Sequence, residues 1–261
     1  MPLLSWILVF CLLGGVLSVL AAALYLLLPE ALRTRLLPHT VSFAIGALLG
    51  AALLGLLPHA LESAGDQDFH AITGALLLGL FGFFLLEKLV LWRHCHHEDC
   101  EVHTPVEQGH EHRAAGTLIL IGDGLHNFID GILIGAAFLT DIHLGVVTSL
   151  AVAAHEIPQE VGDFAVLLHS GFTVSKAFFY NLLASLATIV GGVLAYYALR
   201  QVEPVLPYVL AVAASSFIYV AVADLIPGLH KRVEFSATVQ QMLLIGAGVA
   251  LIYFTHFRLH P

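Results

Sequence analysis

Charged side chains are scarce in this sequence, at 11% of 261 residues, against ~25% in a typical soluble globular protein. This scarcity excludes an ordinary soluble domain. Basic residues are fewest: ten Lys and Arg stand against 19 Asp and Glu, and nowhere do four or more basic residues cluster. Because nucleic-acid binding requires a positive patch, a nucleic-acid partner is excluded as well.

Cysteine is also rare. There are three, Cys11, Cys95 and Cys100, and Cys11 lies inside an apolar run. They cannot form a disulfide framework, so stability must come from helix packing. Histidine, by contrast, is abundant, with 16 residues. Because imidazole is the commonest metal ligand, the composition indicates a metal-binding protein.

Apolar residues make up 59% of the chain, and the mean hydropathy is +0.90. Several apolar runs approach the ~20 residues that cross a bilayer. We therefore predict an all-α polytopic membrane protein, an eight-helix bundle that forms a single transmembrane domain over residues 1–261. The first run has no basic residue before it and exceeds the length of a signal-peptide core, which favours a retained span. The predicted spans cover residues 4–28, 41–62, 71–92, 115–139, 144–168, 173–198, 206–227 and 238–257.

The basic residues predict an orientation. Only Arg200 and Arg258 fall on one face of the membrane, and the other eight fall on the opposite face. The positive-inside rule makes the second face cytoplasmic and places both termini outside. The compact chain favours a bacterial cytoplasmic membrane. The eight residues of the cytoplasmic face are Arg33, Arg35, Lys88, Arg93, Arg113, Lys176, Lys231 and Arg232.

One connection is long and polar. Residues 93–114 read RHCHHEDCEVHTPVEQGHEHRA, and the charge count places them on the cytoplasmic face. A tract this rich in His and Cys is typical of a loose metal binder, since its spacing matches no zinc finger; a merely solvated loop is the alternative. Its candidate ligands are His94, Cys95, His96, His97, Cys100, His103, His110 and His112.

Ionisable residues inside a span are costly and therefore indicate function. Span 115–139 contains GDGLHNFIDG, whose polar residues recur at i, i+3, i+4 and i+7 and so form one stripe. Span 144–168 contains HEIPQEVGD, with similar spacing. We predict that the two stripes face each other. Their members are Asp123, His126, Asn127 and Asp130 in the first span and His155, Glu156, Gln159, Glu160 and Asp163 in the second.

Unneutralised carboxylates on facing stripes would repel one another, and a divalent cation removes that cost. Imidazole nitrogen, carboxylate oxygen and amide oxygen suit Zn, Fe, Mn, Co or Cd better than Cu(I). Pro158 lies in the middle of its span and frees the carbonyl of Ala154, so a kink there is expected to open room beside His155 and Glu156.

The motifs HNFIDG and HEIPQEVGD, with His126 and His155 29 residues apart, closely resemble the signature of the ZIP (Zrt/Irt-like protein) family of metal-ion transporters. The second motif is similar to the LIV-1 form. The resemblance implies eight spans, termini outside, a His-rich cytoplasmic loop and transport of a divalent metal into the cytosol, with zinc foremost and iron, manganese or cadmium as alternatives. It also implies an elevator-like motion of spans one, four, five and six against the others, and a homodimer. No catalytic cofactor is expected, since the metal is cargo.

Carried over by position, His126, Asp130 and His155 resemble ligands of the main site, with Gln159 in the remaining position. Asn127 and Glu156 would serve an adjacent second site, with Asp130 as the bridge. The sequence departs from the family at Gln159, because LIV-1 members have His there and many others have Glu. The Gln159 amide oxygen is a weaker, uncharged ligand, which bears on the metal preference and on the number of ions held, and Glu160 is the nearest residue that would compensate.

Polar residues at other depths suggest a path. His59 and Glu62, near the outer end of the second span, are candidates for an entrance whose negative field concentrates cations. Asp123, Asp163 and Asp224 are candidates for an exit.

Two other functions remain open at this stage. An intramembrane zinc hydrolase would use three fixed ligands and Glu156 as base, but HEIPQE lacks the second His of a zincin and Pro158 interrupts its helix. A metal sensor would keep the site and lack a path. Nothing resembles a nucleotide-binding loop, which disfavours ATP-driven pumping by this chain alone.

Overall fold

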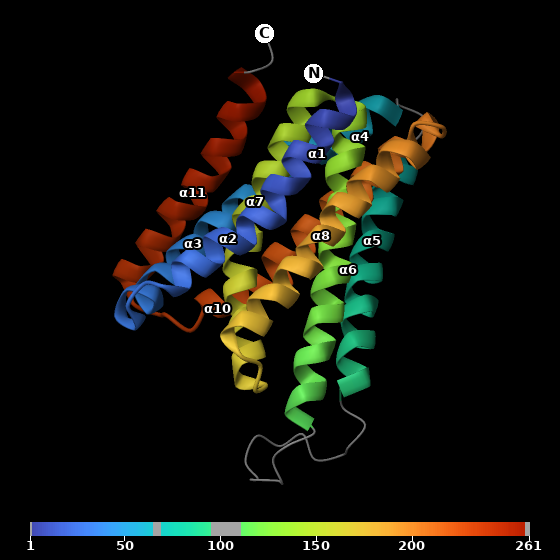
Figure 1. Ribbon diagram of the computed structural model, residues 1–261. Helices are drawn as coiled ribbons and strands as arrows, with labels where there is room; N and C mark the ends of the chain where they lie inside the picture. The colour runs from blue at the N-terminus through green and yellow to red at the C-terminus, as the bar shows by residue number, and fades with distance from the viewer. Residues whose placement is uncertain (1, 65–68, 95–110, 259–261) are drawn as a thin grey trace.

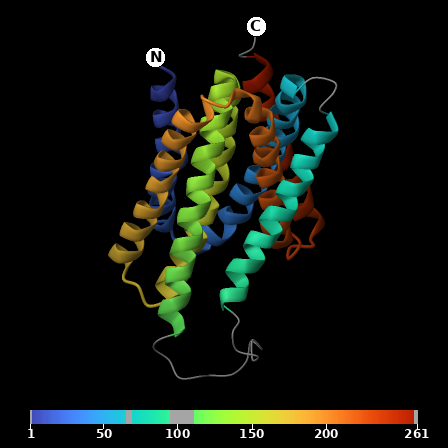
Figure 2. The same ribbon diagram turned by 90° about the vertical axis from the view of Figure 1, so that its right-hand side faces the viewer.

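The structure, a computed structural model, describes residues 2–64, 69–94 and 111–258. These residues form long helices that run side by side (Figure 1). The two termini lie at one end of the bundle, and the helices that end at His94 and begin at Glu111 have those ends at the other (Figures 1 and 2). We call these the termini end and the loop end. The all-α prediction is confirmed, because every regular element in the described residues is helical.

The elements in chain order are α1 (Leu3–Gly14), α2 (Val16–Leu26), α3 (Glu30–Gly50), η1 (Ala51–Leu56), α4 (Leu57–Ala64), α5 (Phe69–His94), α6 (Glu111–Thr140), α7 (Ile142–His169), α8 (Val174–Leu199), η2 (Glu203–Val205), α9 (Leu206–Tyr219), η3 (Val220–Leu225), α10 (Ile226–Leu229) and α11 (Phe235–Arg258).

Seven helical segments within the described residues are long and apolar enough to cross a membrane. They match seven of the eight predicted spans. The eighth, α7, has 28 residues, more than the ~20 needed. α7 is not among the seven apolar segments because the polar stripe that includes His155, Glu156 and Glu160 interrupts its apolar sequence. All eight predicted spans are thus helical.

The predicted start of the second span at residue 41 was wrong. Its helix begins at Glu30 and continues to Ala64 over 35 residues, so Arg33 and Arg35 belong to a helix and not to a loop. Pro38 lies inside this helix, where proline removes an N–H donor and leaves the carbonyl four residues earlier without its helical partner. Here Arg232 Nη2 donates to that carbonyl, on Thr34, at 3.2 Å.

Two π-helical turns were also missed by the sequence analysis. In each case, η1 or η3 interrupts a long helix two residues before a proline, Pro58 or Pro227. Such turns shift the register of the helix and are frequent at functional sites. η3 contributes to the cavity described below.

Close backbone contacts hold two helix pairs together. A side chain at Gly131 would strike the carbonyl of Thr188 across the α6–α8 interface, and one at Gly46 would strike the carbonyl of Ile245 across the α3–α11 interface. These are the two most extensive helix pairs of the bundle. Small residues permit this approach, as they do in many membrane proteins.

The connections at the two ends of α7 contain a left-handed glycine and two helix-capping side chains. Gly171 has φ +81°, a left-handed conformation that only glycine adopts at low cost. Thr173 then caps α8, accepting a hydrogen bond from the Lys176 amide at 3.4 Å. At the other end of α7, Asp141 caps the helix by accepting from the Leu144 amide at 2.9 Å.

Candidate metal site

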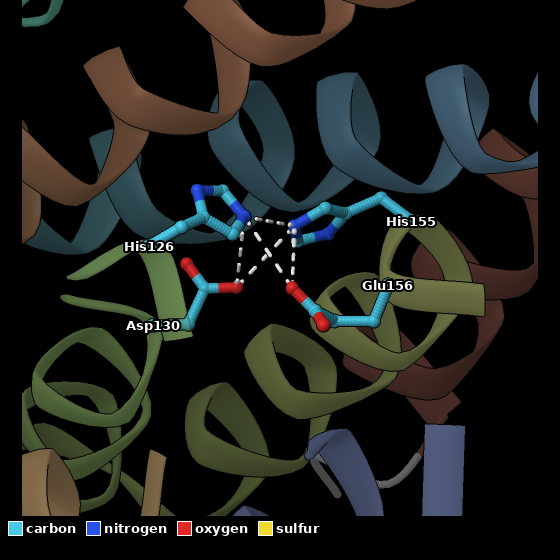
Figure 3. Close-up of side chains that lie close together, drawn as sticks. All are labelled: His126, Asp130, His155 and Glu156. Carbon is cyan, nitrogen blue, oxygen red and sulfur yellow. Dashed lines mark hydrogen bonds and ion pairs between the residues drawn. The ribbon is translucent and has the colours of Figure 1, made fainter. Parts of the chain in front are cut away.

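The two polar stripes face each other, as predicted. Four residues converge on one point: His126 and Asp130 from α6, and His155 and Glu156 from α7 (Figure 3). One ligand atom from each lies within 4.8 Å of the other three. We call this group the histidine–carboxylate cluster.

The spacing of these atoms fits a metal ion. The two Nε2 atoms are 3.1 Å apart. His126 Nε2 lies 3.7 Å from Asp130 Oδ2 and 3.4 Å from Glu156 Oε1, and His155 Nε2 lies 3.3 Å and 3.7 Å from the same two oxygens. A tetrahedral zinc with bonds of ~2.0–2.1 Å separates its ligands by about 3.3–3.4 Å. The five distances bracket that value, so the cluster can close around a zinc-sized ion with small movements.

The cluster is buried and its acceptors are unsatisfied. Asp130, His155 and Glu156 are each 1% exposed. Within the described part of the chain, neither Asp130 Oδ2 nor either oxygen of Glu156 has a hydrogen-bond partner. Such buried carboxylates are costly unless a cation neutralises them. Nδ1 of His155 lies 3.0 Å from the carbonyl of Ala151, and a hydrogen bond there directs Nε2 into the cluster, the orientation that metal-binding histidines adopt.

A second group adjoins the first. Asp123, Glu156 and Glu160 also bring one oxygen each to within 4.8 Å of one another, and all three are buried. We call it the carboxylate cluster. Its shared member is Glu156, where the resemblance implied Asp130 as the bridge. Asp123, expected on an exit path, belongs to this cluster.

Asn127, expected as a ligand of the second site, makes two buried side-chain hydrogen bonds next to the carboxylate cluster. Its amide Nδ2 donates to Asp123 Oδ1 at 2.8 Å, and its Oδ1 accepts from Thr188 Oγ1 at 2.8 Å. Asn127 therefore orients Asp123, and Thr188 of α8 orients Asn127. The sequence contained no signal for this contact, since Thr188 lies 61 residues further along.

A cavity of about 470 Å³ leads from the clusters toward the loop end. Asp123, Asp163 and Asp224, the three predicted exit residues, all line it, and so do His126 and Gln159. Gln159 thus faces the same cavity as His126 of the histidine–carboxylate cluster. Pro158 also lies in the wall of the cavity, although α7 continues through it as one helix.

Across the same cavity, the Tyr219 hydroxyl donates to Glu87 Oε2, joining α9 to α5. Both residues were missed by the sequence analysis. Asn181 of α8 is 1% exposed and lies close to Glu160.

Toward the termini end, the same two helices are apolar. Ile134 and Phe138 of α6 and Val147 and Ala151 of α7 are at most 2% exposed. Phe217 of α9 packs against the His155 ring, with ring centroids 6.1 Å apart. The clusters are therefore open toward the loop end and closed by apolar packing toward the termini end.

The predicted entrance residues, His59 and Glu62, lie on α4, outside the cavity and both clusters. The His59 ring meets that of His256 on α11 edge to face, with centroids 5.2 Å apart. His256 was not singled out from the sequence, because no pattern links α4 to α11.

The His-rich loop was predicted over residues 93–114. The flanking helices reach into that range, since α5 ends at His94 and α6 begins at Glu111, before His112. The remaining candidate ligands lie outside the described residues: Cys95, His96, His97, Cys100, His103 and His110.

Several known proteins are similar to this chain in sequence. The family model described as ZIP Zinc transporter matches residues 92–256, more than half of the chain. The chain is 42% identical over 144 residues to zinc transporter ZIP10 of Danio rerio, an alignment that covers 52% of this chain and 17% of the relative. It is 42% identical over 155 residues to zinc transporter foi of Drosophila melanogaster, covering 58% and 21%. It is 33% identical over 249 residues to zinc transporter ZIP4 of Rattus norvegicus, covering 72% and 38%.

The chain thus spans between about a sixth and two fifths of the length of these relatives. The family match confirms the assignment made from the two motifs. It also agrees with the membrane-spanning helices of the fold. The chain belongs to the ZIP zinc transporter family.

Proposed function

We propose that this chain transports a divalent metal ion, zinc foremost, into the cytosol through the histidine–carboxylate cluster. The observation that carries the proposal is the convergence of His126, Asp130, His155 and Glu156 at near-tetrahedral spacing inside a membrane bundle. Two imidazoles and two carboxylates form a donor set that suits zinc, with iron, manganese and cadmium as alternatives. Their two negative charges balance one divalent ion when both imidazoles are neutral.

In this proposal the ion leaves through the cavity that Asp123, Asp163 and Asp224 line. The apolar packing around Phe138 and Val147 blocks the opposite direction, so this is the conformation expected to release an ion into the cytosol after it has entered from the outside. With the loop end in the cytosol, a negative-inside potential favours entry by about 4.6 kcal/mol per 100 mV for a 2+ ion. His59 and Glu62 are proposed to receive the ion at the outer side.

Alternating access requires motion, and we propose an elevator-like displacement. α6 packs extensively on α8, while α1 packs on α8 and α7; α3 packs on α11, and α5 on α9. The first set carries the clusters and would move as a body against the second. The proposed membrane orientation has both termini outside. The relatives named above are animal proteins, so the bacterial membrane stays a prediction, as does the homodimer.

The test is metal uptake into proteoliposomes that hold the purified chain and an internal metal-sensitive dye, comparing Zn²⁺, Fe²⁺, Mn²⁺ and Cd²⁺. We expect saturable uptake that is fastest for Zn²⁺ and is lost in His126→Ala. His39→Ala is the matched control, since His39 lies on α3 and bonds to the carbonyl of Arg35. Tight binding without uptake would contradict transport and favour a sensor.

A further inference from the structure

Three arginines surround a groove at the loop end of the bundle, away from both clusters. Arg33 and Arg232 line a hollow of about 420 Å³ between α2, α3, α7 and the connection from α10 to α11. Arg35 lines an adjoining hollow together with Arg232. We call Arg33, Arg35 and Arg232 the arginine groove.

These arginines have no ionic partner within residues 2–64, 69–94 and 111–258, where every ion pair within 4.0 Å joins a histidine to a carboxylate. Glu30 also lines both hollows, but its carboxylate lies more than 4.0 Å from the guanidinium nitrogens of these arginines. Nε of Arg33 is buried without a hydrogen-bond partner in this part of the chain. Arg232 donates to the carbonyl of Thr34. The groove therefore holds positive charge that is available to an external anion.

The rest of the wall shows what kind of anion fits. Leu26, Leu37, Val161 and Ala165 line the same hollow. They belong to helices that cross the membrane, and they lie near the ends of those helices, where a bilayer places its headgroups. Guanidinium groups bind phosphate oxygens with paired hydrogen bonds. A small soluble anion would make no favourable contact with the aliphatic side chains. A phospholipid would contact both parts of the hollow, with its phosphate on the arginines and its acyl chain on the aliphatic side chains.

We propose that the arginine groove binds the phosphate of an anionic phospholipid, whose acyl chain lies against Val161 and Ala165. Basic pockets between transmembrane helices are known to hold anionic headgroups. The lipid would then contact both α3 and α7, and α7 carries half of the histidine–carboxylate cluster. A bound lipid therefore stabilises the arrangement in which the cavity opens at the loop end.

The test uses metal-free protein in a neutral detergent, so that its result is independent of transport. Lipid retention is measured by native mass spectrometry with dioleoylphosphatidylglycerol, dioleoylphosphatidylcholine or inorganic phosphate, and the melting temperature is followed in parallel. We expect phosphatidylglycerol to be retained and to raise the melting temperature more than phosphatidylcholine does. Each arginine removed should weaken phosphatidylglycerol binding about fivefold, and Arg33→Ala with Arg232→Ala by about 25-fold.

Lys176→Ala is the matched control, a basic residue at the loop end on α8, outside the groove, and its binding should be unchanged. Arg232→Lys keeps the charge without the paired donors and should fall between wild type and Arg232→Ala. Equal binding of the two lipids, unchanged binding in the double variant, or competition by phosphate alone at equal strength would each overturn the proposal. A double variant that melts early without lipid is replaced by Arg35→Ala, which leaves the bond to Thr34 intact.

Discussion

The two clusters share Glu156 but differ in their donors. The histidine–carboxylate cluster combines two nitrogens and two oxygens around one point, whereas the carboxylate cluster offers oxygen alone from Asp123, Glu156 and Glu160. Mixed nitrogen and oxygen donors favour zinc and its neighbours, and oxygen donors are less selective among divalent ions. The comparison suggests a division of labour, in which the first cluster selects the metal and the second passes it toward the cavity.

Replacing Asp130, a member of the histidine–carboxylate cluster, is expected to have the largest effect on transport. Asp130→Ala deletes a donor that lies 3.3 Å from His155 Nε2 and belongs to the first cluster alone. Because even indirect ligand partners are worth ~10–100-fold, uptake in proteoliposomes should fall by about 100-fold or more. Size-exclusion chromatography and helical circular dichroism verify folding. Full-rate uptake by the folded variant would remove the histidine–carboxylate cluster from the transport path.

Replacing Glu156, which belongs to both clusters, is expected to have the next largest effect on cation binding and uptake. Glu156→Gln keeps the shape of the side chain and removes its charge from both clusters, so both should bind cations more weakly. Isothermal titration with Zn²⁺ should show loss of affinity at every site formed by these helices, and uptake should fall by roughly tenfold to 100-fold. If only one class of binding site weakens, Glu156 does not join the two clusters.

Asp123→Asn isolates the carboxylate cluster. Asp123 lies outside the histidine–carboxylate cluster. Its replacement should therefore lower the affinity of the carboxylate cluster for a cation by about tenfold, while the cation of the histidine–carboxylate cluster stays bound. Measurement of bound zinc per chain by mass spectrometry distinguishes the two. Equal weakening of both ions would mean that the clusters act as one site, and the proposed division of labour would be lost.

Gln159→His tests whether the residue at position 159 affects which metal is transported. Gln159 lines the cavity beside His126, and histidine would add a nitrogen donor there without adding negative charge. We expect the ratio of zinc to manganese uptake to rise by a few fold, since imidazole suits zinc and oxygen donors suit manganese. Uptake of the two metals in competition gives this ratio directly. An unchanged ratio would mean that position 159 does not reach the ion.

How much of this could be predicted from the sequence depends on the range of each interaction. The stripe of Asp123, His126, Asn127 and Asp130 follows from helical periodicity, a local property, and the structure confirms that it faces α7. The continuation of a helix through Pro38 could not be predicted, because it involves a bond from Arg232, 194 residues beyond that proline's position in the chain. The contact between His59 and His256 likewise depends on how α4 and α11 pack, which no local pattern encodes.

The smallest predicted effect concerns how the carboxylate cluster is oriented. Thr188→Val keeps the shape of the side chain but removes the donor to Asn127 Oδ1, which lies at 2.8 Å in a buried setting. Leaving that oxygen unbonded should cost about 1–3 kcal/mol of stability. Asn127 then holds Asp123 less firmly, so the affinity of the carboxylate cluster for its cation should fall by a few fold, less than in Asp123→Asn. The affinity of the histidine–carboxylate cluster should be unaffected. Ser185→Ala is the matched control, because this buried hydroxyl of the same helix bonds to the carbonyl of Leu182 and not to Asn127. A loss of the first cation instead of the second would show that α8 supports the histidine–carboxylate cluster, and would reverse the roles assigned to the two.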